Sequence, residues 1–332
     1  MAYSLETLSG FESFLQAQGF DNKSTNEIMS YLAGHGFTTQ VAADFETGAN
    51  PPGFDPNAQV DIATNPTVTF SPTGAASLLL DIADSNITVT GSSNVAVSAN
   101  TGDNLINLDS STGNDEVFLG TGNNTVDTGF GSDTVFGGTG NETYYEGTGS
   151  GNDTFYAGTG NNLYVDISSS SNTFIGAGQN GNDSIDLKNT GVGTTDSISL
   201  GNGQNTVDAG SSSDNVAIDQ TGTGSATVTL GSGQDSVDLA TNDGSGVANV
   251  VDSVTAGSGP DTIDFAGASL SQAHLYYSAS GVTVTFGGQL EPNSTGTGYV
   301  PDPSNPPVQT VSVSAAPGSD VTLEFTDAHL KG

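Results

Sequence analysis

The sequence predicts an all-β protein: an irregular parallel β-roll or β-solenoid with a small N-terminal helical hairpin and a C-terminal β cap. Three observations predict it. A glycine-rich nonapeptide unit recurs through the middle of the chain, and a single large apolar residue follows the glycines of each copy. The 332 residues also include 46 Gly and no Cys, with a net charge of −34. Such a composition can signal disorder, but an apolar residue at fixed spacing indicates packed strands.

The repeat is clearest where three copies follow one another without a break, at 120–126, 129–135 and 138–144. Glycines permit the positive φ and the close backbone approach that stacked turns need. The apolar residue of each copy should point into a narrow core between two sheets. Because one copy alone buries little surface, stacking must stabilise the fold. The expected core residues are Val126, Val135, Tyr144, Phe155, Ile185, Val207, Val237 and Ile263.

This unit resembles the G-G-x-G-x-D-x-U-x repeat of RTX proteins, the hemolysin-type calcium-binding family. The resemblance covers roughly residues 101–266 and implies a β-roll that holds several Ca²⁺ ions between adjacent turns. It also implies a type I-secreted protein of the surface-layer, matrix or adhesin kind. The metal ligands that it implies are Asp115, Asp133, Asp153, Asp183, Asp214, Asp235 and Asp261, with the carbonyls of Gly120, Gly122, Gly129, Gly131, Gly138 and Gly140.

The repeat departs from the family pattern in two ways. The leading glycine is mostly replaced, and Asn124, Asn162 and Asn205 stand where the pattern has Asp. We expect these asparagine turns to bind calcium weakly or not at all and to rely on ladders of amide hydrogen bonds.

The charge balance limits the classes of partner. Against 37 Asp and Glu there are only three basic residues, Lys23, Lys188 and Lys331. Nucleic acid is excluded, since phosphates are bound by clustered cations. A carboxylate-rich chain without Cys favours a hard, oxygen-preferring cation such as Ca²⁺ over zinc or iron–sulfur clusters. We expect no membrane insertion, because no stretch is long and apolar enough to span a bilayer.

A second pattern lies on the outward side of the predicted strands. An Asp often follows the core residue and should point away from it. A solvated sheet face explains this most simply; the alternative is an acidic ladder that recruits calcium between neighbouring molecules. Aromatic residues at the same outward position would form a sticky stripe. The aspartates are Asp127, Asp186, Asp208, Asp238 and Asp264, and the aromatic residues are Phe136, Tyr145 and Tyr156.

Four regions are predicted along the chain. Residues 1–46 carry apolar residues at helical spacing from Leu5 and a capping box at 24–27, which indicates a helical cap or an assembly module. Residues 47–100 should form leading solenoid strands without metal turns, and 101–266 the calcium-binding roll. Residues 267–332 should form a β-hairpin cap. This ending resembles the post-repeat region of proteins exported by type I secretion, and the resemblance implies a C-terminal secretion signal; the N-terminus lacks the features of a Sec signal peptide.

The sequence offers no catalytic constellation. His35, His274 and His329 occur singly, and no nucleophile motif is present. We therefore expect no enzyme but a secreted, calcium-dependent structural protein that self-assembles into an extracellular filament, biofilm matrix or surface layer, with adhesion to a cell-surface polysaccharide as an open second role. The alternative is a polysaccharide lyase or epimerase using the solenoid face. A groove for a polyanion needs Lys or Arg, and the roll has only Lys188, which favours the structural role.

Overall fold

The chain is mostly β-strand and folds as a parallel β-solenoid with two short α-helices, as predicted. The computed structural model describes residues 3–17, 22–34, 40–46, 60–63, 67–71, 77–81, 85–176, 180–187, 193–218, 224–240, 250–266, 268–278, 280–294, 299–305, 307, 309–315 and 319–331. It divides into two compact units, Met1–Asn162 and Leu163–Gly332, which are taken in turn below.

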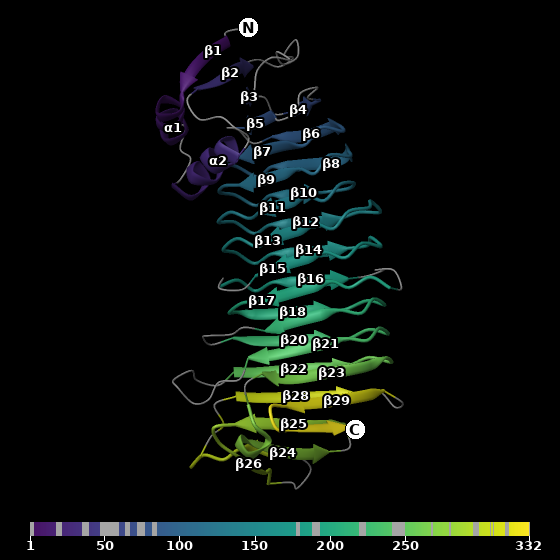
Figure 1. Cartoon of the computed structure of the whole chain (residues 1–332). Helices are drawn as coiled ribbons and strands as arrows, with labels where there is room; N and C mark the ends of the chain where they lie inside the picture. The colour runs from purple at the N-terminus through teal and green to yellow at the C-terminus, as the bar shows by residue number, and fades with distance from the viewer. Residues whose placement is uncertain are drawn as a thin grey trace. The chain divides into compact units, whose positions relative to one another are not determined.

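In the first unit, successive strands alternate between two sheets, and the strands of one sheet lie one above another (Figure 1). The strands are β1 (Tyr3–Thr7), β2 (Gln40–Glu46), β3 (Val60–Ala63), β4 (Thr67–Phe70), β5 (Ser77–Asp81), β6 (Asn86–Gly91), β7 (Val95–Ala99), β8 (Leu105–Ser111), β9 (Glu116–Leu119), β10 (Thr125–Asp127), β11 (Thr134–Phe136), β12 (Thr143–Glu146) and β13 (Thr154–Tyr156). Sheet 1A has the order β1-β2-β3-β5-β7-β9-β11-β13, and sheet 1B has the order β4-β6-β8-β10-β12. Apart from the antiparallel β1, these strands pair in parallel.

The second unit repeats this alternation and ends in antiparallel strands. Its elements are β14 (Leu163–Asp166), β15 (Thr173–Ile175), β16 (Ser184–Leu187), β17 (Ser197–Leu200), β18 (Gln204–Asp208), β19 (Asn215–Ile218), β20 (Ser225–Thr229), β21 (Ser236–Ala240), β22 (Val250–Ala256), β23 (Pro260–Ala266), the 3₁₀ turn η1 (Leu270–Gln272), β24 (Ala273–Ser278), β25 (Gly281–Phe286), β26 (Leu290–Pro292), β27 (Tyr299–Pro301), β28 (Gln309–Ala315), β29 (Asp320–Phe325) and β30 (Ala328–Lys331). Sheet 2A has the order β15-β17-β19-β21-β23-β29-β30, and sheet 2B has the order β14-β16-β18-β20-β22-β28-β25-β24.

The predicted core residues all lie inside. Val126, Val135, Tyr144, Phe155, Ile185, Val207, Val237 and Ile263 are each at most 1% exposed. Strand register puts them in columns, so that Val135 on β11 lies between Val117 on β9 and Phe155 on β13. The period of two along each strand sends the flanking residues outward, and the sequence spacing alone was enough to predict this.

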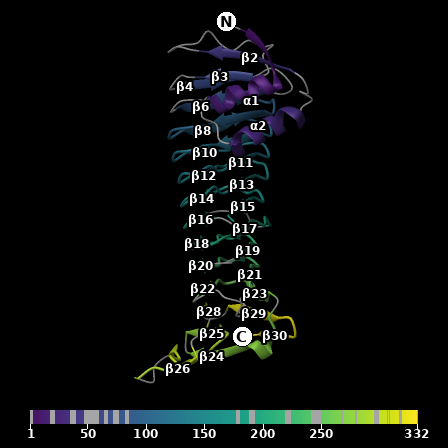
Figure 2. The same ribbon diagram turned by 90° about the vertical axis from the view of Figure 1, so that its left-hand side faces the viewer.

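The helices α1 (Leu8–Ala17) and α2 (Asn22–Gly34) confirm the predicted hairpin but correct its extent and place. Leu5 lies in β1 and not in a helix. The helices lie against one face of sheet 1A (Figure 2). Their apolar side chains pack there on Val60, Leu78 and Phe118. The side chains of the predicted capping box at 24–27 lie partly outside the described residues, and α2 begins before it.

The C-terminal region also differs from the prediction. The predicted hairpin is present as β24 and β25. The later strands of this region belong to the solenoid: β28 joins β22 in sheet 2B, and β29 joins β23 in sheet 2A, both in parallel. The solenoid therefore resumes after the hairpin instead of ending near residue 266, because the alternating valines of β28 extend the same buried columns.

The predicted aromatic stripe is divided between the two sheets of the first unit. Phe136 on β11 and Tyr156 on β13 stack with ring centroids 4.9 Å apart, and Phe118 continues the stack beneath α2. Tyr145 lies on β12 in sheet 1B, away from this stack. The outward aspartates are divided as well. In the second unit, β16 aligns Asp186 with Asp208 on β18 in sheet 2B, and β21 aligns Asp238 with Asp264 on β23 in sheet 2A.

Candidate metal centre

The turns that lead into β9, β11 and β13 of sheet 1A lie along one edge of the first unit, and each ends in an aspartate. Each of these three strands follows directly on an aspartate, namely Asp115 before β9, Asp133 before β11 and Asp153 before β13. Each aspartate is at most 2% exposed. Each lies two residues before an inward-pointing core residue, so the strand period turns it inward too. We call this column, Asp115, Asp133 and Asp153, the aspartate edge.

Hydrogen bonds tie the aspartate edge into a ladder. Oδ1 of each carboxylate accepts the backbone N–H of the equivalent residue one turn earlier. Val95 donates to Asp115 at 3.0 Å, Asp115 to Asp133 at 2.7 Å and Asp133 to Asp153 at 2.8 Å. One oxygen of each carboxylate thereby fixes the spacing between successive turns.

The opposite edge of the first unit carries three asparagines and one glutamate at the equivalent positions. We call its column, Asn104, Asn124, Glu142 and Asn162, the asparagine edge; all four residues are at most 2% exposed. The same ladder runs along it: Asn104 N–H donates to Asn124 Oδ1 at 3.0 Å, and Glu142 N–H donates to Asn162 Oδ1 at 3.0 Å. The predicted amide ladder is thus confirmed, with Glu142 as an unexpected member.

The two edges differ in the terminal side-chain atom that does not take part in the ladder, which is Nδ2 in asparagine and Oδ2 in aspartate. On the asparagine edge, Nδ2 of Asn124 donates to Glu142 Oε2 at 3.0 Å and to the Gly122 carbonyl at 3.4 Å. Nδ2 of Asn162 donates in the same way to its own turn, at 3.3 Å to the Gly160 carbonyl. On the aspartate edge, Oδ2 of Asp115 and of Asp133 is buried and has no hydrogen-bond partner among the described residues.

The second unit has a longer acidic column. Asn172, Asp196, Asp214, Asp235 and Asp261 are linked by the same N–H to Oδ1 bonds, at 2.8, 3.2, 2.9 and 3.4 Å. Oδ2 of Asp196, Asp214 and Asp235 is buried without a hydrogen-bond partner in the described part of the chain. The last turn closes differently, since Oδ2 of Asp261 accepts the N–H of Gly257 at 2.9 Å.

Asp183 belongs to neither acidic column. It precedes β16 in sheet 2B, where Asn205 on the next turn accepts its N–H at 2.9 Å. Farther along this edge Asp252 accepts the N–H of Ala226 at 2.9 Å and lies 3.5 Å from Nε2 of Gln309. The seven predicted aspartates therefore divide into one column of three, one column that holds Asp214, Asp235 and Asp261, and the separate Asp183.

The six predicted glycine ligands divide in the same manner. Gly129 and Gly131 lie in the turn that ends at Asp133, whereas Gly120, Gly122, Gly138 and Gly140 lie in the asparagine-edge turns. These turns stack so closely that a Cβ at Gly138 would overlap the carbonyl oxygen of Gly120. The backbone is alike on both edges at the second glycine, with φ of +114° at Gly122 and +115° at Gly131.

Burial gives the acidic columns unusual titration behaviour. Desolvation, reinforced by the charges of Asp153 and Asp115, raises the pKa of Asp133 from 3.8 to about 9. Burial likewise raises the pKa of Asp196 to about 7 and that of Asp235 to about 6. The pKa values of Asp115 and Asp214 are also raised by burial. A buried carboxylate with a free oxygen is neutralised either by a proton or by a cation.

The carboxylates alone do not complete a metal site. Among the described residues, no three His, Cys, Asp or Glu side chains converge on one point. A cation on the aspartate edge would therefore need backbone carbonyl oxygens as well, which are ligands that Ca²⁺ accepts readily. None of the helices in the described ranges is long and apolar enough to cross a membrane.

Comparisons with protein-family models, curated proteins and solved structures gave no match. The assignment of this site accordingly rests on the chain's own residues.

Sequence reasoning missed five members of the columns: Asn104, Glu142, Asn172, Asp196 and Asp252. The glycine pairs before Asp196 and Asp252, Gly191-Val-Gly193 and Gly244-Ser-Gly246, stand at a different spacing than in the other copies, and Glu142 is not the residue that the repeat expects. A smaller signal would have found the two aspartates: each is followed by Ser and then Ile or Val, as Asp183 and Asp235 are. The acidic residue and the next inward residue define the column, whereas the glycines define only the shape of the turn.

Proposed function

We propose that this chain is a secreted structural protein that needs calcium for its rigidity and self-assembles into an extracellular filament, matrix or surface layer. One observation carries the proposal: the acidic columns bury carboxylate oxygens that have no hydrogen-bond partner in the described residues, at Asp115, Asp133, Asp196, Asp214 and Asp235. A solenoid stacks such groups turn after turn, so the need for compensation is repeated along its length.

The asparagine edge indicates what the aspartate edge lacks. The two edges share the φ of the second glycine and a ladder from backbone N–H to side-chain oxygen, so Oδ2 of Asp133 should occupy the place that Nδ2 takes in Asn124. Nδ2 donates to a turn carbonyl there, but an oxygen cannot. A cation between Oδ2 and the turn carbonyls would restore the attraction, and Ca²⁺ prefers these oxygen donors. Asp133 with the carbonyls of Gly129 and Gly131 is the clearest such set.

Localisation and partners follow from the same chemistry. Calcium-binding modules of extracellular proteins commonly bind the ion only at about 10⁻⁴–10⁻³ M, which suits weak, repeated sites outside the cell. The chain has no Cys for stabilisation by disulfides, so calcium would take that role. The resemblance to RTX repeats supports both export and a matrix or surface-layer role.

Chelation is the direct test of the proposal. Far-UV circular dichroism of the full chain should show a strong β signal in calcium and its loss in excess chelator, because metal binding and folding are linked. Light scattering should rise on addition of calcium. An unchanged β signal under chelation would contradict calcium-dependent folding. A monomer that degrades an acidic polysaccharide in calcium would support the carbohydrate-active alternative instead.

A further inference from the structure

The strand β24 ends sheet 2B and leaves one edge open. It pairs with β25 through the full register from Ala273 to Ser278, and no described strand pairs with its other side. Open edges present unpaired N–H and C=O groups, and proteins usually protect them with charges, proline or a bulge. The sequence of β24, Ala-His-Leu-Tyr-Tyr-Ser, has none of these.

The charge distribution singles out the same strand. No Asp, Glu, Lys or Arg occurs between Asp264 and Glu291, although the whole chain carries a net charge of −34. Two copies of so acidic a chain repel one another over most of their surfaces. This uncharged segment is where a second copy meets the least repulsion, and it is also where an open strand edge lies.

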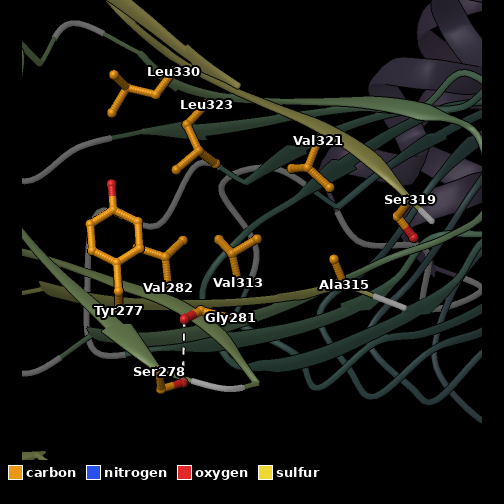
Figure 3. A pocket seen from close by; sticks show the side chains of 10 residues that line it. All are labelled: Tyr277, Ser278, Gly281, Val282, Val313, Ala315, Ser319, Val321, Leu323 and Leu330. Atoms are coloured by element: carbon orange, nitrogen blue, oxygen red, sulfur yellow. Dashed lines mark hydrogen bonds between the residues drawn. The ribbon is translucent and has the colours of Figure 1, made fainter. Parts of the chain in front are cut away.

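An apolar cavity lies beside this edge. Its volume is about 280 Å³, and its lining includes Tyr277, Val282, Val313, Leu323 and Leu330. Figure 3 shows Leu323 and Leu330 on one side, facing Tyr277 and Val282 on the other. Tyr277 is 69% exposed, the largest exposure of any large apolar or aromatic side chain in the described residues. An exposed aromatic ring at the mouth of an apolar cavity is typical of an interaction surface.

The other face of β24 is already occupied. The ring of Tyr276 lies 5.0 Å from that of Tyr299 on β27, and its hydroxyl accepts the N–H of Leu290 at 2.9 Å. His274 lies 3.2 Å from the side chain of Gln289. The hairpin of β26 and β27 therefore fixes β24 from one side and leaves Leu275 and Tyr277 for contact on the cavity side.

We propose that β24 pairs antiparallel with β24 of a second copy, about a two-fold axis perpendicular to the sheet at Tyr276. Such an axis keeps the cavity faces of both strands on the same side, so Leu275 lies opposite Tyr277 of the second copy, and Tyr277 opposite Leu275. The contact is self-complementary, as a two-fold interface must be. This inference rests on the self-assembly part of the proposed function and supplies one contact by which copies join.

Single cysteines test the symmetry, because the natural chain has none. In an antiparallel pair, directly opposite Cα atoms lie about 4.5–5.5 Å apart, within the range for a disulfide. Under mild oxidation, Tyr276→Cys should cross-link to itself, and a mixture of Leu275→Cys and Tyr277→Cys should form the mixed disulfide. Tyr145→Cys, at a tyrosine of the first unit that is 42% exposed, is the control and should stay uncross-linked. Cross-linking of Tyr145→Cys to the same extent would overturn the proposal.

Sedimentation of charge variants provides a second, independent readout. Wild-type protein in calcium should contain a species of twice the 33.2 kDa chain mass. Tyr277→Glu should abolish that species at concentrations where Tyr145→Glu retains it, since only the former places like charges at the edge. Equal association of both variants, or cross-links only between β24 and another strand, would refute the two-fold contact. Circular dichroism in calcium and in chelator separates calcium-dependent folding from the two-fold β24 contact. A chain that folds in calcium but stays monomeric contradicts the contact and leaves calcium-dependent folding standing.

Discussion

The two edges of the first unit are built on one plan with different chemistry. Both stack turns through an N–H to side-chain oxygen ladder, and both place the ladder residue at most 2% exposed. On the asparagine edge, Nδ2 of Asn124 donates to the Gly122 carbonyl of its own turn and to Glu142 of the next turn. On the aspartate edge the corresponding atom of Asp133 has no hydrogen-bond partner in the described part of the chain. The amide groups of the asparagine edge are thus satisfied by protein atoms, whereas Oε1 of Glu142 on that edge and Oδ2 of Asp133 on the other are buried without a hydrogen-bond partner in the described residues.

The turns that precede Asn124 and Asp133 share φ at the second glycine, +114° at Gly122 and +115° at Gly131, whereas of their first glycines only Gly129 has a positive φ, +70°. Both residue types extend the same ladder. In the proposed function, the number of aspartates therefore sets how many turns bind a cation. The acidic column of the second unit, from Asp196 to Asp235, adds to that number.

Core substitutions should have the largest effect, and they should affect both edges equally. Val126 and Val135 are fully buried in strands that follow the asparagine and aspartate edges. Replacing either with Asp buries an unpaired charge and should cost on the order of 4 kcal/mol in free energy of unfolding. Urea denaturation in calcium would measure it. Thr134→Ala, on the outward side of β11, should change the value by less than about 0.5 kcal/mol; similar losses for Thr134→Ala and Val135→Asp would mean that the strand faces are reversed.

Asn124→Asp should break the asparagine edge. The new Oδ2 would face the carboxylate of Glu142, where Nδ2 now donates at 3.0 Å. Losing this hydrogen bond and burying a second charge should lower the free energy of unfolding by about 3 kcal/mol in chelator. Denaturation of Asn124→Asp and of the neutral control Asn124→Ala would measure the effect. A loss no greater than that of the alanine variant would contradict the role given to Nδ2.

The pH dependence of stability should depend on calcium. Raised folded pKa values mean that the folded state holds protons more tightly than the unfolded state, so their stabilisation is complete below 3.8 and is lost as the pH rises. Without calcium, the denaturation midpoint should fall as the pH rises above 3.8, and the contribution should be fully lost by about pH 6 for Asp235, about 7 for Asp196 and about 9 for Asp133. With calcium, which binds the deprotonated carboxylates, this fall should be abolished or reversed. A midpoint in chelator that rises over the same range would argue against buried acidic columns.

Local patterns predicted the core well, because the strand period is short and each turn repeats it. The apolar position one residue after Thr134, and the acidic position one residue before it, could both be read from the repeat. The aspartate and asparagine edges could not be separated in this way, since that requires knowing that successive copies fall on alternate edges. Asp196 and Asp252 were missed because the glycines before them do not stand at the spacing of the repeat.

The position of the helices depended on long-range packing. In β5 and β7, apolar residues that point to opposite faces of the sheet are both buried: Leu78 and Leu79 in β5, and Ala96 and Val97 in β7. A strand buried on both faces reads as a continuous apolar run, and this run was the available sign that something covers the outer face. The return of β28 and β29 to the solenoid was equally long-range, because it follows a hairpin insertion.

The central claim is that the buried Oδ2 of Asp133 requires a cation, whereas Nδ2 of Asn124 is satisfied by hydrogen bonds to the protein. The variant Asp133→Asn tests this claim most directly. Its Nδ2 should donate to the turn carbonyls, so in chelator the free energy of unfolding should rise by about 1–2 kcal/mol relative to wild type. In calcium the variant should lose that advantage, and titration calorimetry should show fewer bound ions per chain. A variant that is less stable than wild type in chelator and binds calcium with unchanged stoichiometry would contradict the account.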